Sequence, residues 1–138
     1  MRSSPILLSF GIAFFLLLAP LPSRAQRSRI RAIESLQIDR SDDAWDVTIA
    51  LGVPIQLRRH SPASRGKAVQ VQVTVLAGAE TPRDPQSLSV PRQAPIPLES
   101  VSYEPGDGEF PVLELRFSRE VDFEVQQGRD LRSIVLRC

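Results

Sequence analysis

A catalytic triad would have to be built from very few side chains in this chain. Its 138 residues include one histidine, His60, and one cysteine, Cys138, which is also the last residue. A serine or cysteine nucleophile needs a base such as histidine. His60 lies in residues 58–62, which we predict to be a turn, and no nucleophile-elbow glycine pattern accompanies it. We therefore expect a solvated loop histidine, no catalytic residue and no enzyme activity.

Metal sites are not expected either. Zinc requires three or four Cys, His or carboxylate ligands at close spacing, and one histidine with one terminal cysteine does not supply them. Asp42, Asp43 and Asp46 form the densest acidic cluster, but the glycine-bearing loop and distal carboxylate of a calcium site are missing. Cys138 is predicted to fray with the terminus, which argues against a nucleophile. The sequence predicts no metal and no cofactor.

Three acids, Glu120, Asp122 and Glu124, occur at alternate positions and so fall on one side of a predicted strand. Two carboxylates in a cleft can cleave a glycosidic bond. A row of this kind is also typical of a solvated strand that resists edge-to-edge pairing. We favour the solvated row, and a carboxylate-dependent glycan hydrolase is the second alternative function.

Arginines are frequent near the last predicted strands. This set consists of Arg116, Arg119, Arg132 and Arg137. Cross-strand pairing with acids of the same region would account for both signs of charge. Those acids are Glu114, Glu120, Asp122 and Glu124. The alternative is a binding face on which arginine and glutamine side chains contact sugar hydroxyls and muramyl-peptide carboxylates. The candidate ligand-binding residues are Arg58, Gln70, Gln72, Arg116 and Arg132.

Strands must position these side chains. Beyond residue 25, apolar residues recur mostly at every second position and are rich in valine. In residues 69–75 valines alternate with glutamine or threonine, so one face belongs to a core and the other to water. We predict further strands at residues 33–38, 45–51, 98–103, 112–117, 121–125 and 131–137, an edge continuation at 55–57 and a short segment at 88–90. The pattern predicts an all-β domain, a small antiparallel β-sandwich of about seven short strands.

Turn signals separate these strands. Residues 41–44 predict a polar hairpin turn, and residues 105–108, Pro-Gly-Asp-Gly, predict a second turn. Five prolines between residues 82 and 97 predict a long surface connection. Trp45 is in phase with Val47 and Ile49, which places it in the predicted core rather than on a sugar platform.

The first 25 residues have the pattern of an export signal. Arg2 provides a positive start, residues 6–19 are almost entirely apolar, and Ser23 and Ala25 are small residues at the cleavage positions. A retained anchor is the alternative, but the apolar run is shorter than the roughly 20 residues of a spanning helix and is followed by Pro20. We predict a signal peptide at 1–25 and a periplasmic or secreted bacterial domain at 26–138, with the membrane contacted only through the signal peptide.

Cleavage would leave 113 residues (138 minus 25), which suits one domain. Lys plus Arg would fall from 17 to 15 with the loss of Arg2 and Arg24, against 16 acids, a net charge of about −1. This balance gives no argument for nucleic acid as a partner. A single cysteine allows no disulfide within the chain.

Residues 67–73, 110–117, 121–125 and 131–136 resemble the AMIN domain, a periplasmic β-sandwich found beside cell-wall amidases and in some secretins. The resemblance covers most of residues 33–137 and implies two similar halves, with residues 68–75 and 112–117 as equivalent strands. It also implies a non-catalytic domain that binds peptidoglycan or positions a partner at the envelope. No contact residue follows from the resemblance.

The expected function is therefore peptidoglycan binding or localisation of a partner at the cell wall. The first alternative is an assembly module that recruits another envelope protein by strand addition at an exposed edge. An unpaired edge at residues 131–137 would favour strand addition. A flat polar face of Gln70, Gln72, Arg116 and Arg132 would favour a glycan.

Overall fold

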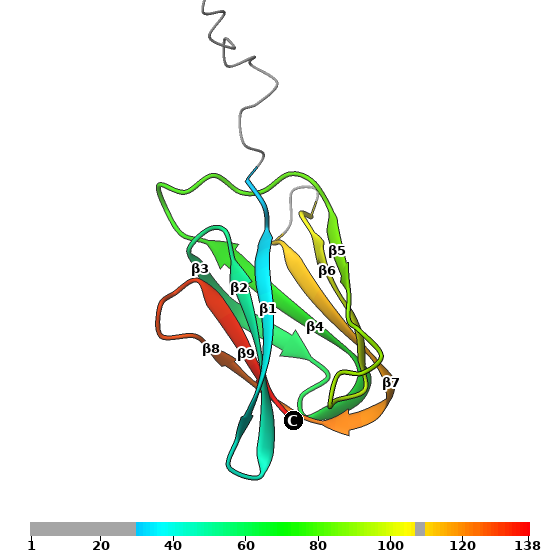
Figure 1. Cartoon of the computed structure of the whole chain (residues 1–138). Helices are drawn as coiled ribbons and strands as arrows, with labels where there is room; N and C mark the ends of the chain where they lie inside the picture. Colours follow the sequence, from blue (N-terminus) through cyan, green and yellow to red (C-terminus); the bar gives the residue numbers. More distant parts are fainter. Residues whose placement is uncertain (1–29, 107–109) are drawn as a thin grey trace, which may run out of the picture.

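The computed structural model describes residues 30–106 and 110–138, and within them the chain is all-β, as predicted (Figure 1). The predicted signal peptide and part of the predicted turn at 105–108 lie outside the described residues. The strands are β1 (Ile33–Ser41), β2 (Ala44–Leu51), β3 (Ile55–Ser61), β4 (Arg65–Val75), β5 (Gln86–Ser89), β6 (Leu98–Glu104), β7 (Val112–Asp122), β8 (Glu124–Gln127) and β9 (Ser133–Arg137). No helix of the described part is long and apolar enough to cross a membrane.

The strands form two antiparallel sheets, which confirms the predicted architecture with more strands than the predicted seven. One sheet has the order β1-β2-β9-β8, and the other has the order β3-β4-β7-β6-β5. Strand β9 lies between β2 and β8, so the edge considered at residues 131–137 does not exist. The edges of the four-stranded sheet are β1 and β8, and those of the five-stranded sheet are β3 and β5.

The core lies between the sheets and follows from the alternation. Val69, Val71 and Val73 of β4 are fully buried, and Gln70 and Gln72 between them face outward. Side chains of the four-stranded sheet bury the opposite half of the core: Val47, Ile49, Leu51, Ile134 and Leu136. Trp45 is half-buried against this core, in agreement with its predicted phase.

Phe123 is the point at which the chain passes from one sheet to the other. Strand β7 ends at Asp122 in the five-stranded sheet, and β8 begins at Glu124 in the four-stranded sheet. The buried Phe123 donates its backbone N–H to the Ser64 carbonyl oxygen at 2.8 Å. The prediction of one strand over residues 121–125 was therefore wrong, because an unbroken period-two pattern gives no signal of a change of sheet.

Two glutamine side chains join the sheets at opposite sides of the sandwich. The amide of Gln86 in β5 accepts from the N–H of Ile33 at 3.0 Å and donates to the carbonyl of Ile33 at 2.9 Å. The amide of Gln127 in β8 accepts from the N–H of Leu57 and donates to the carbonyl of Ile55, both at 2.6 Å. We call these contacts the Gln86 bridge and the Gln127 bridge. Each satisfies main-chain groups of an edge strand that lacks a neighbour there.

Candidate functional site

The outer surface of the five-stranded sheet carries mainly serine and glutamine, and we call it the serine–glutamine face. Its residues are Ser61, Gln70, Gln72, Ser87, Ser89, Ser100, Ser102, Glu114 and Arg116. The register places one row of these side chains across all five strands, in the order Ser61, Gln70, Glu114, Ser102 and Ser87. Neighbouring strands are about 4.8 Å apart, so this row extends about 19 Å.

A shallow hollow of about 340 Å³ lies at the β3 end of this face. Arg59, Ser61, Gln70, Gln72 and Val112 line it together with His60. Its walls offer a guanidinium, a hydroxyl and two amides, which donate and accept hydrogen bonds, beside the apolar side chain of Val112. Such a mixture suits the hydroxyl groups and the apolar ring surface of a sugar.

Glu114 and Arg116 neutralise each other on the serine–glutamine face, and Arg59 adds a positive charge in the hollow at its β3 end. The Nε of Arg116 donates to Oε1 of Glu114 at 2.5 Å within strand β7, and the Arg116 side chain is 67% exposed. The two groups also stand opposite Ser100 and Ser102 of β6. The face therefore presents hydrogen-bonding groups without a strong net charge.

The predicted pairing of the C-terminal arginines is found for Arg116 with Glu114, and the register places Glu124 opposite Arg137, but it is wrong for Glu120 and Asp122. Glu120 and Asp122 both pair with Arg65 of β4, at 3.3 Å each, and not with an arginine of the last strands. Arg137 instead approaches Asp42 at 3.6 Å and Asp46 at 4.0 Å. The error has a topological cause, because β4 and not β9 is the neighbour of β7 at that position.

Arg58 and Phe110 form a stack beside the face. The guanidinium carbon of Arg58 lies 3.8 Å from the centroid of the Phe110 ring, and its Nη1 donates to Thr74 Oγ1 at 3.3 Å. The Val73 N–H donates to the Pro111 carbonyl at 3.0 Å, which fixes the chain next to Phe110 against β4. Phe110 is an exposed large apolar residue that was not predicted as part of a site, because its spacing matches that of a strand.

Four of the five candidate ligand-binding residues lie on one sheet. Gln70, Gln72 and Arg116 share the serine–glutamine face, and Arg58 is the extra residue of a β-bulge at its edge. Arg132 does not join them, since it lies in the connection between β8 and β9, where its backbone N–H donates to Oδ1 of Asp130 at 2.9 Å. The prediction of a shared face with Arg132 is therefore wrong.

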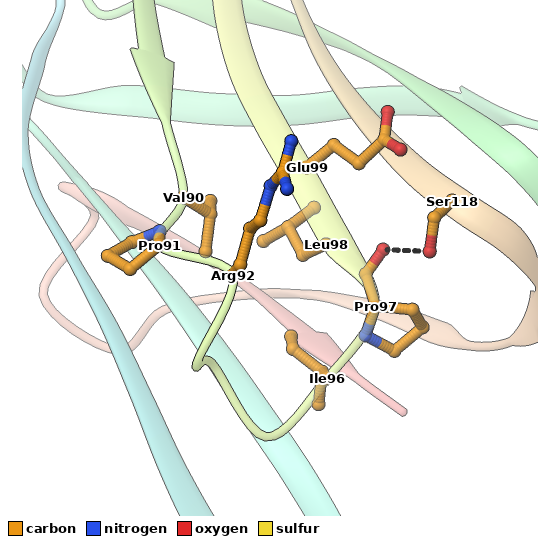
Figure 2. Close-up of a pocket in the computed structure, with 8 residues that line it drawn as sticks. All are labelled: Val90, Pro91, Arg92, Ile96, Pro97, Leu98, Glu99 and Ser118. Atoms are coloured by element: carbon orange, nitrogen blue, oxygen red, sulfur yellow. Dashed lines mark hydrogen bonds between the residues drawn. The ribbon is translucent and has the colours of Figure 1, made fainter.

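A second depression, of about 500 Å³, lies at the loop between β5 and β6 (Figure 2). Three buried apolar side chains, Val90, Ile96 and Leu98, form its floor. The side chains of Arg92 and Glu99 are exposed and extend to the same side of the loop in Figure 2. The prolines of this segment predicted a plain surface connection. A depression formed by tertiary packing of prolines leaves no local sequence signal.

The remaining chemical candidates are placed differently from the predictions. His60 lies in strand β3, half-buried, with its ring 6.3 Å from that of Phe123. Its Nδ1 is 3.1 Å from the Pro62 carbonyl oxygen, which can only accept, so Nδ1 carries the proton. The prediction of a solvated loop histidine is therefore wrong. In residues 30–106 and 110–138, no three His, Cys, Asp or Glu side chains gather closely enough to hold a metal ion.

Cys138 is not frayed, contrary to the prediction. Its N–H and carbonyl each bond to the backbone of Trp45 at 2.8 Å, which continues the β2–β9 ladder. Burial, together with the nearby negative charge of Asp46, raises the pKa of the Cys138 thiol to about 11. The thiol is therefore protonated and weakly nucleophilic at neutral pH.

Comparison of this chain with protein-family models, with curated proteins and with solved structures finds no match. The fold and the geometry of the serine–glutamine face therefore carry the functional argument alone.

Proposed function

We propose that this chain is a non-catalytic domain of the bacterial cell envelope that binds peptidoglycan across the serine–glutamine face. The observation that carries the proposal is the row from Ser61 to Ser87, which presents uncharged or paired polar groups on all five strands. A glycan strand is long, flat and rich in hydroxyls, so it matches a flat row of alternating donors and acceptors better than it matches a closed cleft.

The depression in Figure 2 favours peptidoglycan over a plain polysaccharide. It adjoins the face, because Glu99 is next to Ser100 in β6 and Ser118 lies two residues beyond Arg116 in β7. Its apolar floor would receive the alanine methyl groups of a peptide stem. Arg92 and Glu99 at its rim would contact the carboxylate and ammonium groups of that stem.

Co-sedimentation with insoluble peptidoglycan sacculi, measured across a salt series, tests the proposal. Gln70→Ala is expected to weaken retention about fivefold, because it removes hydrogen bonds worth about 1 kcal/mol. Gln126→Ala is the matched control, since Gln126 is an equally exposed strand glutamine in the other sheet. Equal losses for the two variants, or no retention of the parent chain, would contradict the assignment.

The depression is tested with sacculi whose peptide stems have been removed by an amidase. Arg92→Ala is expected to weaken binding to intact sacculi and to leave binding to the stripped glycan unchanged. Gln70→Ala is expected to weaken both. An Arg92→Ala variant that binds both materials like the parent chain would remove the depression from the proposed site.

A further inference from the structure

Strand β1 is a long edge that no other strand covers within the described residues. It runs over nine residues and pairs only with β2. The Gln86 bridge satisfies the main chain of Ile33 alone, at the beginning of the strand. By contrast, the other edge of this sheet, β8, has four residues and is joined to β3 by the Gln127 bridge.

The hairpin geometry identifies the free main-chain groups of this edge. Ser41 and Ala44 flank a two-residue loop, so they form a hydrogen-bonded pair, and every second residue of β1 before Ser41 also bonds to β2. The N–H and carbonyl groups of Leu36, Ile38 and Arg40 consequently point away from β2. Within the described residues they have no hydrogen-bond partner. Leu36 and Ile38 are also only half-buried.

We propose that β1 pairs antiparallel with β1 of a second copy of this chain, about a two-fold axis at Gln37. In this register Leu36 stands opposite Ile38 of the other copy, and both are hydrogen-bonding positions. Glu34, the extra residue of a bulge, then lies close to Arg40 of the other copy. Arg40 is held over the Trp45 ring, with its guanidinium carbon 5.7 Å from the ring centroid.

The two adjacent registers of the β1–β1 pair are less favourable. Shifting the two copies by one step in one direction puts Glu34 opposite Ile38, and shifting them in the other puts Leu36 opposite Arg40. Of these three registers, only the one centred on Gln37 places every apolar side chain opposite an apolar one and the acidic side chain opposite the basic one. The result is a continuous eight-stranded sheet, which removes both β1 edges.

A charge exchange tests this pairing in sedimentation velocity experiments on the purified chain over a concentration series. Glu34→Arg and Arg40→Glu are each expected to weaken dimerisation about tenfold. Each substitution places two like charges opposite one another at both of the symmetry-related contacts. The double variant is expected to restore the dimer. A parent chain that stays monomeric at every concentration, or a double variant that is not restored, overturns the proposal.

Cysteine cross-linking in a Cys138→Ser background tests the register itself. In the proposed dimer, residue 37 of one chain lies opposite residue 37 of the other. The two form a non-hydrogen-bonded pair, in which the Cα atoms are about 4.5 Å apart and a disulfide fits. Gln37→Cys is therefore expected to form a covalent dimer under mild oxidation. Ser35→Cys is the control, since residue 35 of one chain would lie about 13 Å along the strand from residue 35 of the other. Equal cross-linking of the two variants, or none for Gln37→Cys, overturns the register.

Discussion

The two sides of the sandwich are joined by the same device but differ in how completely they are closed. On the β3/β8 side, the Gln127 bridge spans Ile55 and Leu57, and the Ile55 N–H also donates to the Leu131 carbonyl at 2.7 Å. On the β1/β5 side, the Gln86 bridge holds only Ile33, and β1 continues beyond it without a second strand. The β3/β8 side is therefore closed by several main-chain contacts, whereas the β1/β5 side leaves most of β1 without a second neighbour.

The largest expected effect lies in the turn that supports the β3/β8 side. A Cβ atom on Gly128 would lie 1.8 Å from Ser133 Oγ, and that hydroxyl is already held by Asp130 Oδ1 at 2.8 Å. Gly128→Ala should lower the free energy of unfolding by about 3 kcal/mol. Urea denaturation measures this loss.

The control for this variant is Gly78→Ala in the connection that leads to β5. Gly78 has φ of 88° and no atom within 4 Å of an added Cβ, so only backbone strain of about 1 kcal/mol is expected. If the two alanine variants lose equal stability, the contact between residue 128 and Ser133 does not add to the cost of the substitution.

Alkaline pH should act on the β1/β5 side through Tyr103, which stands opposite Gln86. Burial raises the pKa of Tyr103 to about 12, and its hydroxyl donates to the Pro82 carbonyl at 2.9 Å. Above pH 10 the unfolded chain ionises this group while the folded chain does not. Stability from Tyr103 is thus complete below pH 10 and is lost as pH rises towards 12, by about 2–3 kcal/mol.

Tyr103→Phe isolates this effect. The variant should lose about 1 kcal/mol near neutral pH, because the hydrogen bond to Pro82 is gone. Between pH 8 and 11 its free energy of unfolding should then fall less steeply than that of the parent chain. Parallel pH profiles in urea denaturation would show that Tyr103 ionisation does not affect folding.

The smallest of these effects compares the two bridges directly. Gln127→Leu leaves two main-chain groups without partners between packed edges and should cost about 2 kcal/mol. Gln86→Leu also leaves two main-chain groups without partners, the N–H and carbonyl of Ile33, but at the open side, where water can replace the lost hydrogen bonds, and should cost about 1 kcal/mol. Hydrogen exchange at the Leu57 and Ile33 amides checks where protection is lost. A larger loss for Gln86→Leu would reverse the comparison.

The sequence was informative wherever period-two alternation met a turn signal. The valine face of β4 and the hairpin at residues 41–44 follow directly from these local patterns. The change of sheet at Phe123 and the neighbours of each strand do not, because they depend on contacts between distant segments. For the same reason Gln70, Gln72 and Arg116 were correctly grouped by their outward phase, whereas Arg132 was not.

The bridges and the Arg58–Phe110 stack could not be predicted from sequence. Gln86 and Gln127 look like ordinary polar residues, and only the packing of one sheet on the other shows that their amides meet main-chain groups. Likewise, the stack on Phe110 forms only because Arg58 projects from a bulge in another strand.

The central position of β9 has a consequence for the order in which the molecule is made. Strand β2 can form a hairpin with β1 within microseconds, but its second neighbour, β9, is synthesised only after β3 to β8, when Val47 can pair with Leu136. Contacts between such distant segments slow folding to milliseconds or longer. Until β9 arrives, the inner edge of the hairpin is open to other chains, so a chaperone that shields it would raise the yield of native protein.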